Sequence, residues 1–142
     1  MTKEVERGFV FRRIREIVDP NGSRLRVSVD VAAGHAVTMI EIPSIDPAPR
    51  VVLDPYGTEL LGGYIMSARL ALPQGLPDEV VAGGYATRFQ LVRKPRTSIR
   101  VSQGDGPVFE IPEPFWDKLY AELCMVCAHA REFGRHASTS LH

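Results

Sequence analysis

The sequence predicts one α+β domain, in which about six or seven strands form a curved antiparallel sheet and two helices cover one of its faces. Three observations support this fold class. Short segments that alternate polar and apolar residues recur along the chain, as in half-buried strands. Two longer segments each begin at a proline and repeat apolar residues at helical spacing. The length of 142 residues, with 44% hydrophobic and 24% charged residues, is typical of a single soluble domain.

The first half of the chain begins with a predicted hairpin. Residues 8–18 are rich in aromatic and β-branched side chains, and Asp19-Pro20-Asn21-Gly22 follows as a strong turn signal. The second arm has the clearest alternation in the chain, which predicts one buried and one solvent-exposed face; its apolar positions are Leu25, Val27, Val29 and Val31. Further strands are expected at 37–42 and 50–53.

Two helices are expected, each after a short strand. The first runs from about 55 to 70, because Asp54 is a suitable N-cap and Pro55 suits the first helical position. The second follows Pro112-Glu113-Pro114, and Gly134 is its expected C-terminal cap. Apolar residues define the buried side of each helix: Leu60, Leu61, Tyr64, Ile65 and Ala68 in the first, and Phe115, Trp116, Leu119, Leu123, Val126, Cys127, Ala130 and Phe133 in the second.

The second half of the chain repeats the order of the first. Strands are predicted at 85–93, 97–103 and 108–111, again followed by a proline-capped helix. We therefore divide the single domain, residues 1–142, into half-repeats 8–72 and 79–134 and a flexible tail at 135–142. Two explanations of this strand-strand-strand-helix order stay open, an internal duplication and a coincidence in a β-rich chain.

Charge and hydropathy narrow the class of protein. Seventeen Lys and Arg residues balance seventeen Asp and Glu residues, so no net field draws the molecule toward polyanions or membranes. No apolar run approaches the roughly 20 residues that span a bilayer, and residues 1–13 lack the apolar middle of a secretory signal. Two cysteines are too few for a disulfide framework. We expect a cytoplasmic protein.

No catalytic motif stands out. Cys124 and Cys127 form a C-x-x-C pair, but they lie about ten residues into a helix, where the terminal dipole no longer stabilises a thiolate. We interpret both as packing residues. The histidines, His35, His129, His136 and His142, show no metal-binding spacing, and no serine lies in a G-x-S-x-G setting. The sequence therefore predicts a protein that is not an enzyme and that carries no cofactor or metal.

Two surfaces are candidates for binding. The side of each helix opposite its buried stripe is small and apolar, with Gly62, Gly63 and Met66 on the first helix and Ala121, Met125 and Ala128 on the second. Glycine in a helix costs about 1 kcal/mol relative to alanine, so two adjacent glycines suggest a close helix contact, either with the other helix or with a second chain. The alternative is that these faces are simply solvated.

The second candidate surface is basic. Residues 80–104 contain five basic residues and no acid: Arg88, Arg93, Lys94, Arg96 and Arg100. Arg24, Arg26, Arg88 and Arg100 fall on the polar phase of their strands, so one open sheet face could collect all four and follow a phosphate backbone. Bases also stack on exposed aromatic rings, and Phe89 falls on the apolar phase. An ordinary solvated sheet face is the alternative.

The repeated order of elements resembles the PUR-alpha family of single-stranded nucleic-acid-binding proteins and, more loosely, the plant Whirly proteins. The segments concerned are RLRVSVDV, AVTMIEI and RVVLDPYGTELLGGYIMSAR, then YATRFQLVR, TSIRVSQ and VFEIPEPFWDKLYAELC. No family motif is matched, and the second half is a strand short. The resemblance implies intertwined repeats, often dimeric, that read nucleic acid on the sheet. It assigns no functional residue.

The sequence thus leads to three functional hypotheses. The first is a non-catalytic binding or assembly module that self-associates as a homodimer. The second is a single-stranded nucleic-acid binder that uses the arginine-lined face. The third is a small-ligand or enzyme cavity between the sheet and the helices, because a site can be assembled from residues distant in the sequence.

Overall fold

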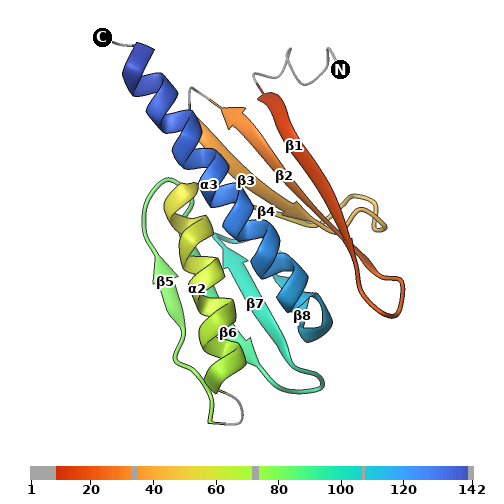
Figure 1. Cartoon of the computed structure of the whole chain (residues 1–142). Coiled ribbons are helices and arrows are strands. Elements are labelled where there is room, and N and C mark those ends of the chain that lie inside the picture. The colour runs from red at the N-terminus through yellow and green to blue at the C-terminus, as the bar shows by residue number, and fades with distance from the viewer. Residues whose placement is uncertain (1–8, 33–34, 72–73, 107, 141–142) are drawn as a thin grey trace.

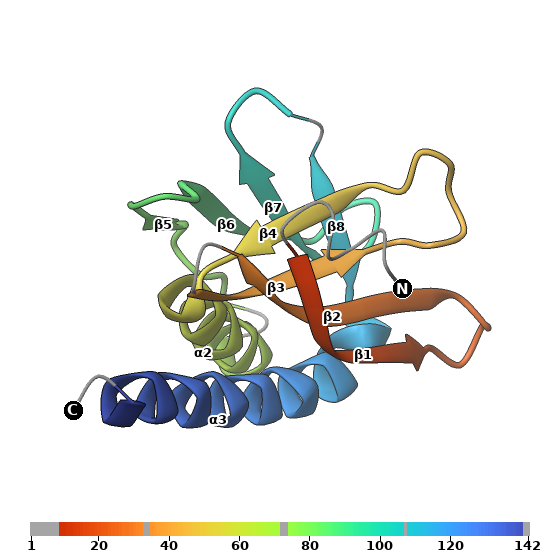
Figure 2. The same cartoon turned by 90° about the horizontal axis from the view of Figure 1, so that it is seen from above.

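In the part of the chain that the structure describes, the strands form two separate antiparallel sheets, with two long helices packed beside them (Figures 1 and 2). The computed structural model describes residues 9–32, 35–71, 74–106 and 108–140. Within these residues each sheet has four strands. The predicted α+β class is confirmed, whereas the expectation of one curved sheet of six or seven strands is wrong.

The first sheet is a meander in which each strand pairs with the next one along the chain. Its strands are β1 (Phe9–Val18), β2 (Arg24–Ala32), β3 (His35–Glu41) and β4 (Arg50–Leu53). The expected turn between β1 and β2 forms, with Gly22 at a φ of 86°. Helix α2 (Pro55–Ala71) follows directly. Its predicted cap is present, because the backbone N–H of Gly57 donates to Oδ1 of Asp54 at 2.7 Å.

The second sheet repeats this meander. Its elements are β5 (Glu79–Val81), β6 (Thr87–Val92), β7 (Ser98–Gln103) and β8 (Phe109–Pro112), then a short 3-10 helix, η1 (Glu113–Phe115), and α3 (Trp116–Ser140). Strand β5 was not predicted, because three residues are too few to show alternation. With β5 each half consists of four strands and a helix.

The end of α3 differs from the prediction. Gly134 was expected to cap the helix, but α3 continues through it to Ser140. A glycine inside a helix costs only about 1 kcal/mol, so it ends a helix only where the following chain turns away. Residues 135–140, which were predicted as a flexible tail, are therefore helical, and residues 141–142 lie outside the described part of the chain.

A single hydrophobic core draws on both halves of the chain. Both helices lie on the same side of the strands and next to each other (Figures 1 and 2). The predicted stripes face this core: Leu61, Tyr64, Ile65 and Ala68 of α2 and Phe115, Trp116, Leu119, Leu123 and Val126 of α3 are buried. The side chains of Ala130 and Phe133 lie outside the described residues.

Each helix also contacts the strands of the other half. The centre of the Tyr64 ring on α2 lies 5.8 Å from the centre of the Phe89 ring on β6. From α3, Glu122 accepts a hydrogen bond from Arg13 of β1 at 2.8 Å, and Nζ of Lys118 donates to the carbonyl of Val18 at 3.0 Å. Neither half therefore completes its core without the other.

The two sheets meet at the outer edge of β4, which no strand covers in the described chain. There the side-chain amide of Gln103, at the end of β7, takes the place of a neighbouring strand. Its Nε2 donates to the carbonyl of Val52 at 2.6 Å, and its Oε1 accepts the N–H of the same residue at 3.2 Å. Alternation of polar and apolar residues could not predict this arrangement, because the arrangement depends on which edges of the two sheets lie next to each other.

Among the described residues, neither helix is both long enough and apolar enough to cross a membrane.

Candidate functional site on the outer face of the helices

The predicted small apolar residues lie on two neighbouring helices and face outward. Gly63, Met66, Ala121, Met125 and Ala128 are exposed, and the exposed fractions are 39% for Met66 and 55% for Met125. Gly62 is buried. Met66 and Met125 add exposed apolar area on neighbouring helices, and burial of such area against a partner would be favourable. We call this surface the helix face.

A groove of about 220 Å³ lies between α2 and α3 beside the helix face, and Gly62 and Gly63 are the predicted small apolar residues that line it, whereas Met66, Ala121, Met125 and Ala128 do not. It is lined by Thr58, Glu59, Gly62, Gly63, Tyr120, Leu123, Cys124, Cys127 and Arg131. A Cβ atom at either glycine would have no atom of a neighbouring element within 4 Å. The first alternative for the glycines, a close contact with the other helix, is therefore wrong, whereas a contact with a second chain stays a prediction. The helical wheel showed the side on which they lie, but it could not show how near the other helix comes.

The mouth of the groove carries one charge of each sign. Nη1 of Arg131 on α3 lies 3.2 Å from Oε2 of Glu59 on α2, and both side chains are more than half exposed. An exposed pair of this kind contributes between about 0 and 1 kcal/mol to stability, so either partner can be exchanged at little cost.

Both cysteines border the groove and are free thiols. Cys127 is half-buried, which is compatible with a packing residue. Cys124 is exposed, so the prediction that it is a packing residue is wrong. Burial, together with the nearby Glu59 carboxylate, raises the pKa of the Cys127 thiol. This direction is opposite to that of a catalytic cysteine, whose thiolate must be stabilised.

Metal ligands do not gather anywhere in the part of the chain that the structure describes, where no group of three or more His, Cys, Asp or Glu side chains could hold an ion. The side chains of His35, His129, His136 and His142 lie outside the described residues. That the protein carries no metal and no cofactor stays a prediction.

We expect the two thiols to differ in reactivity toward iodoacetamide at pH 8. Cys124 should alkylate first, whereas Cys127 should react several-fold more slowly, because burial and a raised pKa both reduce its thiolate fraction. Timed alkylation followed by peptide mass spectrometry measures the two rates. The variants Cys124→Ser and Cys127→Ser identify each signal, and faster labelling of Cys127 than of Cys124 would contradict the prediction.

The four arginines of the predicted basic face do not share one sheet. Arg24 and Arg26 lie on β2 of the first sheet, whereas Arg88 and Arg100 lie on β6 and β7 of the second. The prediction of a single open face is therefore wrong. It assumed one continuous sheet, and alternation along a strand cannot tell which sheet that strand joins.

Each of these arginines is also paired with a carboxylate. Arg24 and Arg26 both contact Glu16, at 2.9 and 3.0 Å, and Arg26 lies 3.5 Å from Glu41. Arg88 lies 3.3 Å from Asp78, and Arg100 lies 3.1 Å from Glu110. The hydrogen bonds from Arg26 and Arg24 lower the pKa of the Glu16 carboxyl. Such pairing weakens the attraction that these guanidinium groups could offer to phosphates.

Phe89 faces the core, as predicted, and is completely buried. It pairs with Val101 and lies on the inner face of the second sheet.

Nucleic-acid binding stays a prediction, and a titration of the protein with a labelled oligo-dT at low salt tests it. Saturable binding that is lost when Arg24, Arg26, Arg88 and Arg100 all become serine would favour it.

Sequence reasoning missed contacts between the halves, among them the Gln103 amide on β4 and the Glu59–Arg131 pair across the groove. No local pattern distinguishes these residues from other polar residues. The sequence matches no protein-family model. No curated protein matches it either.

Proposed function

We propose that the protein is a non-catalytic binding and assembly module that forms a homo-oligomer through the helix face. The observation that carries the proposal is the groove between α2 and α3, where Gly62 and Gly63 leave open space and exposed Met66 lies on the same helix. Two helix glycines together cost about 2 kcal/mol relative to alanine, and nothing in the described chain uses the space they provide. A side chain of another molecule would use it.

The occupant that fits best is a second copy of the chain. A twofold interface brings the same patch of both subunits together, so it must be complementary to itself. The helix face meets this requirement, because it is small and apolar and carries one acid and one base at the groove mouth. In a dimer, Arg131 of one subunit could pair with Glu59 of the other.

The size of the helix face is also adequate. Helix α2 has 17 residues and α3 has 25, which correspond to lengths of about 25 and 37 Å. Side by side, two such helices present an area similar to the roughly 800 Å² that each partner buries in a stable complex.

We expect Gly62→Leu and Gly63→Leu to shift the oligomer toward monomer. In the isolated chain the Cβ of the new side chain would have no atom of a neighbouring element within 4 Å, and leucine raises helix propensity by about 1 kcal/mol, so we expect the monomer to keep its stability. In the oligomer it would fill the groove that receives the partner, at a cost of about 1–3 kcal/mol, or roughly a 5- to 150-fold rise in the dissociation constant. Sedimentation equilibrium measures this constant, and urea unfolding measures the stability.

Ser67→Leu is the matched control, because Ser67 is exposed on the same helix but does not line the groove. It adds the same side chain and should leave the dissociation constant unchanged. A monomeric mass for the unmodified protein at all concentrations would contradict the proposal. An unchanged dissociation constant in both glycine variants would contradict it as well.

A further inference from the structure

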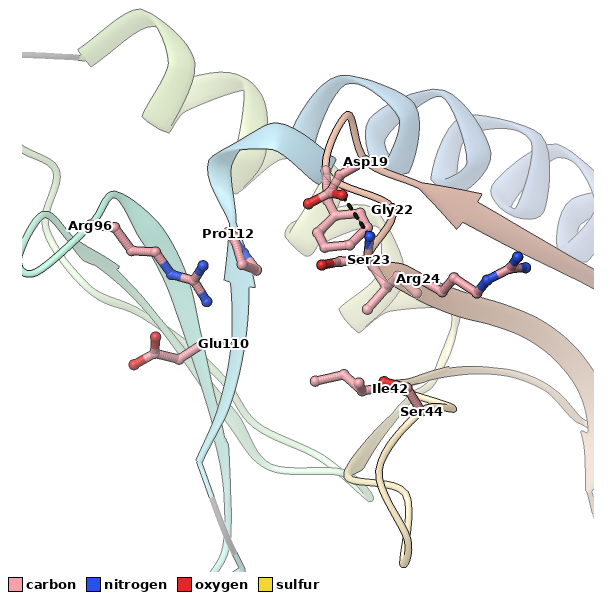
Figure 3. Close-up of a pocket in the computed structure, with 11 residues that line it drawn as sticks. Asp19, Gly22, Ser23, Arg24, Ile42, Ser44, Arg96, Glu110 and Pro112 are labelled. Carbon is pink, nitrogen blue, oxygen red and sulfur yellow. Dashed lines mark hydrogen bonds between the residues drawn. The ribbon is translucent and has the colours of Figure 1, made fainter.

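A second cavity, of about 320 Å³, lies where the two halves of the chain meet, away from the helix face (Figure 3). Its walls are the turn between β1 and β2, the loop between β3 and β4, the loop before β7, and β8 with η1. We call it the junction cleft. Its volume is at the lower end of the range of small-molecule sites, which begins at about 300 Å³.

Most charged groups of the junction cleft are already satisfied. Arg24 extends away from the cleft in Figure 3 and pairs with Glu16 at 2.9 Å. Glu110 accepts hydrogen bonds from Nε and Nη2 of Arg100, at 3.2 and 3.1 Å. Oδ1 of Asp19 accepts the backbone N–H groups of Asn21 and Ser23, at 2.9 and 2.8 Å. These groups shape the cleft but have little remaining capacity for a ligand.

Arg96 is different. It forms no ion pair or hydrogen bond with any residue that the structure describes, and its side chain is exposed. Figure 3 shows its guanidinium group extending toward β8, beside Glu110 and Pro112. A guanidinium group presents a planar fork of donors that matches the two oxygens of a carboxylate. Arg96 is therefore the group in the junction cleft that can hold an anion.

The deeper wall of the junction cleft is apolar. Leu25 and Phe115 are buried, with exposed fractions of 1% and 4%, and the partly buried Ile42 also lines the cleft. The exposed Ser23 and Ser44 add hydroxyl groups near the opening. An apolar wall with a few polar groups at its edge is the usual composition of a small-molecule site, in which the polar groups orient the ligand.

The remaining charges decide the class of anion. Asp19 and Glu110 place carboxylates in the same cleft as Arg96, so every additional negative charge on a ligand would be repelled. A monoanion is therefore favoured over a dianionic phosphate ester. We propose that the junction cleft binds a small organic monocarboxylate, whose apolar body lies against Leu25 and Phe115 and whose carboxylate pairs with Arg96.

Benzoate is a suitable probe, and its binding can be followed by two-dimensional amide NMR of the full chain. We expect saturable shifts of the Ser23, Ser44 and Arg96 signals, with a dissociation constant in the millimolar range. Benzyl alcohol, which lacks the charge, should bind about tenfold more weakly, since a charge-assisted hydrogen bond is lost. Phenyl phosphate should also bind more weakly than benzoate. Equal or tighter binding of either control would overturn the proposal, as would the absence of saturable benzoate shifts.

Two variants test the position of the ligand. Arg96→Gln should weaken benzoate binding about tenfold, whereas Arg93→Gln in the same loop should leave it unchanged, because Arg93 does not line the cleft. Ser44→Tyr should block the opening and abolish binding while both glycines of α2 remain intact. Unchanged benzoate affinity in Arg96→Gln and Ser44→Tyr would overturn the proposal. Because the junction cleft does not include the helix face, oligomer formation should be the same in all three variants.

Discussion

Trp116→Ala should lower the free energy of unfolding by about 3–5 kcal/mol, the largest loss that we expect from one substitution. Trp116 begins α3 and is completely buried. Its Nε1 donates to the carbonyl of Ile111 at 2.9 Å, and the Arg69 guanidinium lies 5.0 Å from the centre of its ring. Alanine would leave a cavity, an unpaired buried carbonyl and a cation without its aromatic partner. Urea unfolding followed by circular dichroism measures the change.

Trp116→Phe separates the contributions of Trp116, and Tyr56→Ala is a control on the protein surface. Trp116→Phe keeps much of the apolar volume but removes the Nε1 donor, so it should cost less than alanine while leaving the Ile111 carbonyl unpaired. Tyr56→Ala removes an aromatic side chain that is 60% exposed and should change stability by no more than about 0.5 kcal/mol. A loss below about 1 kcal/mol for Trp116→Ala would show that the core does not depend on this residue.

Gln103→Ala should destabilise the protein by about 1–3 kcal/mol, because it removes the amide that covers the edge of β4. The N–H and the carbonyl of Val52 would both lose their partner. The same Nε2 also donates to Oγ1 of Thr87 at 2.9 Å, so a third hydrogen bond would be lost. Urea unfolding measures the total effect, and hydrogen exchange of the Val52 amide reports on the edge itself. We expect faster exchange at Val52 in the variant.

Gln90→Ala is the control for this prediction, because Gln90 lies on the outer face of the same sheet and its loss should change stability by about 0.5 kcal/mol or less. Gln103→Glu is a second test. Its carboxylate could still accept the Val52 N–H but would face the Val52 carbonyl without a proton to donate. Its loss of stability should therefore be greater at neutral pH than at acid pH, where the carboxyl is protonated. Unchanged Val52 exchange in Gln103→Ala would contradict the role of this amide.

Most elements could be predicted from the sequence, because their signals are local. Alternation in β2 and the proline and aspartate at the start of α2 act within a few residues, and the structure places both elements within one residue of the expected positions. Strand β5 and the end of α3 could not be predicted. A three-residue strand exists because β6 lies beside it, and a helix passes through a glycine when nothing redirects the chain.

The candidate sites depended more strongly on tertiary structure. Helical spacing correctly placed Met66 and Met125 on the exposed side of their helices, but it could not show that Gly62 faces open space. The polar phase of the strands identified Arg26 and Arg100 as outward-facing. It did not show that Glu16 and Glu110 lie opposite them in the register, which is why a basic face was expected where ion pairs are present.

The sequence by itself determined most of the local structure of this protein, namely the longer strands, the start of each helix, and the side of each element that is buried. These properties follow from residue periodicity and capping, which act over one or two turns or a single strand. The tertiary structure alone decided that there are two sheets, that a glutamine side chain closes one edge, and that Arg96 reaches a cleft between the halves. These features arise where segments distant in the sequence meet. Such contacts produce no periodic pattern of residues in either segment, so they could not be predicted from the sequence.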